Sequence, residues 1–174
     1  MTDLKDIKGF AFDIDGVMTD GGILADLEGQ LYRTFDAKDG FAVRMASMNG
    51  YPVGVITGAR SQSVRARFCG NGIPPEDIYL GSRDKLTDFE DFCRRHGLKC
   101  SEVMYFGDDV PDVAVMVAAG IGVAPSDAAE EAREAADVVS PRPGGRGCVR
   151  FHMEEVMKAQ GRWDFDVNVY KSKF

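Results

Sequence analysis

The chain has 174 residues, 44% of them apolar and 28% charged, which is the composition of an ordinary globular protein of one domain. Its formal net charge of -7 disfavours nucleic acid or an anionic membrane as a partner, so a negatively charged ligand would need a local cluster of Lys and Arg. There is no recognisable signal peptide, no apolar run long enough to span a bilayer and no metal-ligand spacing among the four cysteines, which predicts a cytoplasmic protein with free thiols.

The first expected strand, over residues 7–14, ends in two carboxylates, Asp13 and Asp15. Because side chains alternate along a strand, the two point the same way and repel each other unless a cation or a shared proton lies between them. Such a pair is typical of metal-assisted phosphoryl transfer, in which one carboxylate is the nucleophile and the other carries the proton. An ordinary turn is the alternative, since Asp and Gly often follow a strand.

A hairpin is expected next, over residues 21–35, with a polar turn at residues 26–30. Residues 36–40 then lead into a helix that ends at residues 49–50. Arg44 lies on this helix, where it is either a solvated side chain or a ligand contact.

Strands and helices alternate over the remainder of the chain. Strands are expected at residues 53–57, 78–80, 103–106, 121–123 and 137–139, and helices from residue 61, from residue 85, after Pro111, over residues 127–136 and from residue 148. The stretch 161–174 has no clear element. The alternation predicts an α/β fold with a doubly wound parallel sheet, in a single domain over residues 1–174.

Polar side chains collect where these strands end. Asp13, Thr57 and Asp108 each follow a strand, and ligands of such folds bind at the carboxyl ends of the strands. Lys85 can reach the same edge. It lies in a first helical turn, where the helix dipole disfavours cations, and this position indicates a role at the site. The acidic run at residues 107–112 is only partly explained by helix capping, and its oxygen ligands suit Mg²⁺.

Taken together these segments resemble the four motifs of the haloacid dehalogenase superfamily. The motifs are Asp13-x-Asp15-Gly-Val-x-Thr, Ile56-Thr57-Gly58, Lys85 and Gly107-Asp108-Asp109-x-x-Asp112. The resemblance implies that Asp13 takes the phosphoryl group and that Asp15 protonates the leaving alkoxide and then activates water. It implies that Thr57 and Lys85 hold the phosphate oxygens. Mg²⁺ would bind Asp13, Asp108 and the backbone carbonyl of Asp15, with Asp109 and Asp112 orienting the ligands.

Superfamily members commonly carry a cap domain. This chain has room only for a hairpin and a helix before Thr57, and for one helix and one strand between Thr57 and Lys85. We therefore expect an oligomer whose protomers close each other's sites. The segments 35–40, 144–147 and 159–161, together with Arg44 and Arg67, are similar to those of the 3-deoxy-D-manno-octulosonate 8-phosphate phosphatases. This resemblance implies a capless homotetramer of the Gram-negative cytoplasm, acting in lipopolysaccharide precursor synthesis. The substrate contacts implied are Asp36, Ala37, Lys38, Asp39, Gly40, Arg44, Thr57, Gly58, Arg60, Arg67, Lys85 and Arg146.

Two departures leave the substrate open. The family often has Arg directly after the Thr-Gly pair, where this chain has Ala59 and then Arg60, and it has Lys38 where Arg is usual. Either Arg60 makes the contact from the next position in the chain, or one contact to the substrate carboxylate is absent. Phosphatases of nine-carbon sugar acid 9-phosphates tend to carry an acidic residue at the place of Ala59, so the sequence favours the eight-carbon substrate. A non-catalytic sugar-phosphate-binding protein is the alternative of another class, and a mutase would need a water-excluding cap.

Overall fold

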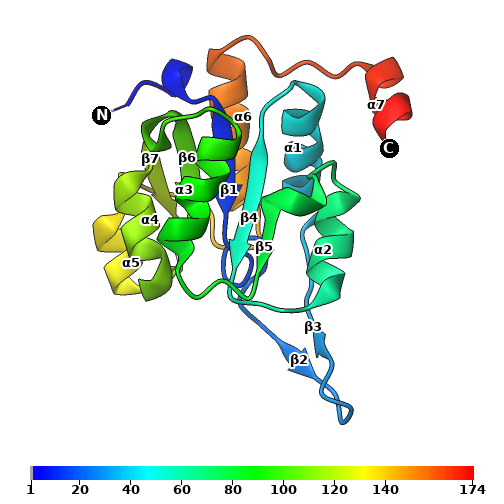
Figure 1. Ribbon diagram of the computed structural model, residues 1–174, viewed down its shortest axis with the longest axis vertical. Helices are drawn as coiled ribbons and strands as arrows, with labels where there is room; N and C mark the ends of the chain where they lie inside the picture. The colour runs from blue at the N-terminus through cyan, green and yellow to red at the C-terminus, as the bar shows by residue number, and fades with distance from the viewer. Residues whose placement is uncertain (1) are drawn as a thin grey trace.

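The computed structural model describes residues 2–174 and contains a six-stranded parallel sheet between two layers of helices (Figure 1). The strand order is β5-β4-β1-β6-β7-β8, with bounds β1 Gly9–Phe12, β4 Val53–Thr57, β5 Ile78–Leu80, β6 Val103–Phe106, β7 Ile121–Ala124 and β8 Val138–Val139. Every neighbouring pair is parallel. The doubly wound α/β fold expected from the sequence is thereby confirmed.

Helices cover both faces of this sheet. One layer consists of α1 Ala37–Met48, α2 Gln62–Cys69 and α6 Cys148–Ala159, and the other of α3 Lys85–Arg95, α4 Val113–Ala118 and α5 Glu130–Ala135. Alternation along β1 divides the core between them, since Phe10 and Phe12 pack toward the first layer and Ala11 toward the second. Phe12 lies against Phe68 of α2, with ring centroids 5.5 Å apart. Burying such rings contributes about 1.5–3 kcal/mol each, which fixes the central strand firmly.

The hairpin projects from the body at the end of the sheet where the strands reach their carboxyl ends (Figure 1). Its strands are β2 Leu24–Ala25 and β3 Leu31–Tyr32. Asp26 closes the turn by accepting hydrogen bonds from the backbone N–H groups of Glu28 and Gln30. Among the described residues 2–174, only this hairpin and α1 lie between β1 and β4. This part of the chain therefore contains no cap domain.

The structure differs from the expected elements in three places. β1 is shorter than the run 7–14, because residues 7 and 8 precede the strand and the chain bends at Ile14. The helix expected over residues 127–136 is reduced to α5. The stretch 161–174, expected to lack an element, contains α7 Val167–Lys173, capped by Asp166. None of the helices in residues 2–174 has the length and apolar character needed to cross a membrane.

Candidate active site

Asp13 is fixed by the central strand of the sheet. Its backbone N–H donates to the carbonyl of Phe106 on β6 at 3.0 Å, so the sheet ladder continues through the residue. Its side chain is buried. The turn that follows depends on Gly16, whose φ of +89° favours glycine and where a Cβ would lie 1.9 Å from Asp108 Oδ2. Gly144 packs as closely from the other side, where a Cβ would lie 1.8 Å from the carbonyl oxygen of Gly16.

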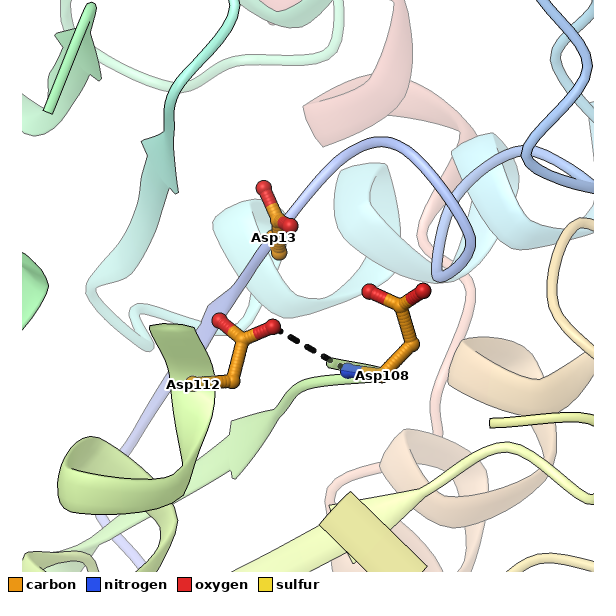
Figure 2. A group of neighbouring side chains, drawn as sticks. All are labelled: Asp13, Asp108 and Asp112. Atoms are coloured by element: carbon orange, nitrogen blue, oxygen red, sulfur yellow. Dashed lines mark hydrogen bonds between the residues drawn. The ribbon is translucent and has the colours of Figure 1, made fainter. Parts of the chain in front are cut away.

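Three carboxylates gather at this sheet edge (Figure 2). Asp13, Asp108 and Asp112 each place an oxygen within 4.8 Å of the others. Oδ1 of Asp13 and Oδ1 of Asp108 are buried without a hydrogen-bond partner in the described structure. Burial and the charge of Asp112 raise the pKa of Asp13 to about 6, although Lys85 opposes the shift. Burial and the charges of Asp13 and Asp112 raise the pKa of Asp108 to about 8. Unpartnered oxygens under mutual repulsion fit a divalent cation, which hard oxygen ligands would hold.

The oxygens of Asp112, in contrast, are occupied. Oδ1 accepts from Lys85 Nζ at 2.8 Å and from the Tyr105 hydroxyl at 2.7 Å. Oδ2 accepts from the backbone N–H groups of Asp108 at 3.1 Å and Asp109 at 3.3 Å. Asp112 therefore orients Lys85 and the loop after β6, whereas Asp13 and Asp108 keep open ligand positions.

Lys85 lies between two of these carboxylates. Its Nζ is 2.9 Å from Asp13 Oδ2 and 2.8 Å from Asp112 Oδ1. Burial by itself would lower the pKa of Lys85, but the charges of Asp13 and Asp112 outweigh it and hold the pKa above its usual value. The unfavourable place of a cation in the first turn of α3 is thus compensated by both carboxylates. Asp84 caps the same helix by accepting from the Thr87 N–H.

A cavity of about 350 Å³ brings the main predicted residues together. Its lining includes Asp13, Asp15, Thr57, Gly58, Lys85 and Asp108. Thr57 ends β4, and its hydroxyl oxygen accepts from the Ala59 N–H at 3.2 Å, which leaves the hydroxyl hydrogen free for an incoming oxygen. Carboxylates, an ammonium and a hydroxyl that converge in this way can bind a phosphate ester and attack it.

Asp15 has a partner that the sequence did not indicate. The guanidinium of Arg33 forms two hydrogen bonds with it, Nε to Oδ1 at 2.6 Å and Nη2 to Oδ2 at 2.9 Å. The pair explains how Asp13 and Asp15 can share one cavity, since Arg33 balances the second charge. Nothing in the apolar alternation of residues 31–35 distinguished Arg33 from a solvated hairpin residue. Tyr105 was missed similarly, because it lies within an apolar strand.

The side chains expected to contact the sugar lie in separate places. Arg60 lines an adjoining cavity of about 760 Å³, between the hairpin and residues 58–63. Lys38 and Arg146 line another, of about 370 Å³, beside α6. A pocket of about 170 Å³ between α1 and α2 is lined by Ala37, Gly40, Phe41, Arg44, Arg67 and Asn71. Within one protomer these groups are not brought to the cavity of Asp13.

Two other expected contacts have a role inside the fold. Asp36 caps α1 by accepting from the Lys38 and Asp39 N–H groups. Asp39 is fully buried and accepts from the Gly147 N–H at 3.0 Å and the Arg150 N–H at 2.8 Å, which ties α1 to the start of α6.

Arg44 lies against the C-terminal helix. It donates to the Tyr170 hydroxyl at 2.6 Å and stacks over the Phe174 ring, with 4.9 Å between the guanidinium carbon and the ring centroid.

Comparison with known proteins agrees with this geometry. The chain is 34% identical over 164 residues to the 3-deoxy-D-manno-octulosonate 8-phosphate phosphatase of Salmonella typhi, covering 94% of this chain and 86% of that protein. A family profile of haloacid dehalogenase-like hydrolases matches residues 74–149. The chain belongs to the haloacid dehalogenase superfamily. It is a phosphoric monoester hydrolase of that superfamily, and the sequence-based recognition is confirmed.

Solved structures of haloacid dehalogenase proteins share the fold described above. A subfamily III A hydrolase from Legionella pneumophila superposes with a TM-score of 0.90 at 32% identity, covering 97% of this chain and 92% of that one. The 3-deoxy-D-manno-octulosonate 8-phosphate phosphatase of Moraxella catarrhalis has a TM-score of 0.87 at 34% identity, over 92% and 91% of the two chains. That protein was solved in complex with a magnesium ion, a phosphate ion and KDO.

Proposed function

We propose that the protein hydrolyses 3-deoxy-D-manno-octulosonate 8-phosphate to the free sugar acid and phosphate in a Mg²⁺-dependent reaction. The observation that carries this proposal is the Asp13 carboxylate. One oxygen is held by Lys85 and the other is unpartnered, on a cavity shared with Asp108. A binding protein would have little physical reason to keep a buried carboxylate in this state. The identity to relatives that act on this sugar acid phosphate supports the substrate.

In this reaction Asp13 attacks the phosphorus atom, and the bond from phosphorus to the sugar oxygen breaks. Asp15 gives its proton to the departing oxygen, so the sugar leaves as an alcohol. An aspartyl phosphate remains on Asp13, and Asp15 then accepts a proton from the water that hydrolyses it. Lys85 and the Thr57 hydroxyl hold the phosphoryl oxygens throughout.

The metal would be held by Asp13, Asp108 and the backbone carbonyl of Asp15. When bound, it neutralises charge on the phosphoryl group and on the two carboxylates. Burial and neighbouring carboxylates raise the pKa values of Asp13 and Asp108, and a bound cation would offset that repulsion. Asp109 and Asp112 lie next to this set, and Asp112 fixes the loop that carries Asp108.

We further propose a cytoplasmic homotetramer, acting in lipopolysaccharide precursor synthesis, in which neighbouring protomers complete each other's sites. Arg44, Arg67 and Lys38 do not line the cavity of their own Asp13. A substrate with a carboxylate needs cations of this kind, which a neighbouring protomer can supply. The exposed apolar side chains of the hairpin support its burial against a second copy, with Leu24 70% exposed and Leu27 fully exposed.

The test is phosphate release in the presence of Mg²⁺ from a panel of the eight-carbon 8-phosphate, nine-carbon 9-phosphates and simple hexose phosphates. A strong preference for the eight-carbon acid is expected. Preference for a nine-carbon acid would keep the mechanism and change the substrate. No release from any member would instead favour a sugar-phosphate-binding protein.

A further inference from the structure

Arg33, at the end of the hairpin, forms an ion pair with Asp15 that has two hydrogen bonds. Arg33 follows β3 directly and lies 18 residues after Asp15 in the chain. Its Nε and Nη2 reach the two oxygens of Asp15 at 2.6 and 2.9 Å, which is the bidentate geometry that fixes both partners most firmly. The Arg33 side chain is only 3% exposed, although the rest of the hairpin is largely exposed to solvent.

This pair is more than a structural contact. Nη1 of Arg33 is buried and has no hydrogen-bond partner in residues 2–174. A buried donor without a partner destabilises the fold, so an arginine kept for stability alone would have that donor satisfied. Arg33 and Asp15 also line the same cavity of about 760 Å³, which adjoins the cavity of Asp13 through Asp15 and Gly58.

We propose that Arg33 is a positioning residue for Asp15 and that the hairpin sets the place of the proton carrier. The inference rests on the proposed function, in which Asp15 gives a proton to the leaving group. A carboxylate at the end of a loop can rotate, and the two bonds from Arg33 hold it in one orientation. Fixed in this way, Asp15 offers the same face of its carboxyl group to the departing sugar oxygen.

The consequence is a dependence on the leaving group. Hydrolysis of benzyl phosphate breaks the bond from phosphorus to the benzyl oxygen, and this departing alkoxide oxygen needs the proton of Asp15. In p-nitrophenyl phosphate the departing phenolate is stable without a proton. Misplacing Asp15 should therefore slow the first ester far more than the second, whereas damage to phosphate binding or to the fold should slow both equally.

The experiment compares kcat/KM for these two esters, with Mg²⁺, in wild type and in four variants. Arg33→Gln should lower the ratio of benzyl to p-nitrophenyl kcat/KM by roughly tenfold or more. Arg33→Lys keeps the charge without the bidentate geometry and should give a smaller drop. Asp15→Asn should give a larger drop than either. Arg94→Gln, in an exposed arginine paired with Asp91, is the matched control and should keep the wild-type ratio.

An unchanged ratio in folded Arg33→Gln would overturn the inference, provided that Asp15→Asn lowers it. Should Arg33→Gln fail to fold, as judged by circular dichroism, a wild-type ratio in Arg33→Lys would overturn it equally. If Asp15→Asn leaves the ratio unchanged, the proton-carrier role fails and the inference falls with it. That result differs from one in which Asp15→Asn lowers the ratio and the Arg33 variants do not.

Discussion

At the scale of single residues, Asp13 is held between an attractive and a repulsive neighbour. Lys85 approaches one oxygen, while burial and the charge of Asp112 act against ionisation and raise the pKa of Asp13. Asp13→Asn keeps the shape and removes the nucleophile, so turnover should fall by roughly a thousandfold or more. The melting temperature should stay equal or rise, because a repulsive charge is lost. Phosphate release and thermal melting check both, and activity near that of wild type would refute the nucleophile.

The same carboxylates predict how stability depends on pH without metal. The folded protein keeps protons on Asp13 up to about pH 6 and on Asp108 up to about pH 8, whereas the unfolded chain releases them near pH 4. The folded state thus keeps more protons on these two carboxyls between these values, so their contribution to stability falls as the pH rises from about 4 to 8.

Mg²⁺ should replace those protons and remove the repulsion. We expect its addition to raise the melting temperature more at pH 8 than at pH 6, with a stabilisation of about 2.7 kcal/mol at a hundredfold excess over Kd. Thermal melts with Mg²⁺ and with EDTA at both pH values measure this. An increase of the same size at both would contradict the assignment of the metal site to Asp13 and Asp108.

At the scale of elements, Asp39 connects α1 to α6. Asp39→Ala leaves the N–H groups of Gly147 and Arg150 without an acceptor inside the protein, which should cost about 1–3 kcal/mol of unfolding free energy. Urea unfolding measures the loss. Asp36→Ala, at the more exposed cap of α1, should cost about 1 kcal/mol. The KM of folded Asp39→Ala should stay unchanged, and a raised KM would instead favour the substrate contact that the family resemblance implied.

Most elements were predictable because their apolar patterns have clear ends. β4, β5 and β6 lie where the buried runs predicted them, and α6 begins at Cys148 as expected. α7 was not predictable, since its contacts to α1 come from Tyr170 and Phe174 rather than from an apolar stripe.

The residues at the strand ends were predictable for a topological reason. Parallel strands bring their carboxyl ends to one edge, so Asp13, Thr57, Lys85 and Asp108 had to converge. Arg33 was not predictable, because the direction in which a hairpin leaves a sheet is set by tertiary contacts rather than by alternation. The same holds for Arg44, which the structure pairs with the chain's own C-terminal helix.

At the scale of the whole molecule, the hairpin is the main exposed apolar feature outside the sheet layers. Leu24→Asp with Leu27→Asp should weaken association, because it places charges in a surface that a second copy would bury. Light scattering after size exclusion should show a smaller species. Its preference for the sugar acid phosphate over p-nitrophenyl phosphate should fall by roughly tenfold or more.

The control for this change is Val117→Asp on α4, a similarly exposed apolar residue, at 71%, away from the hairpin. It should leave both the association state and the preference unchanged. A Leu24 and Leu27 variant that is monomeric yet as selective as wild type would count against sites shared between protomers.

The order of strands has a consequence for synthesis on the ribosome. β1 is translated before both of its neighbours, β4 and β6, yet it lies between them in the sheet. The glycines at 144 and 145, which pack against the turn after Asp13, lie far downstream of it in the sequence. A nascent chain therefore exposes an unpaired apolar strand until its partners emerge, and it acquires catalytic competence only after the segment with these two glycines has been made.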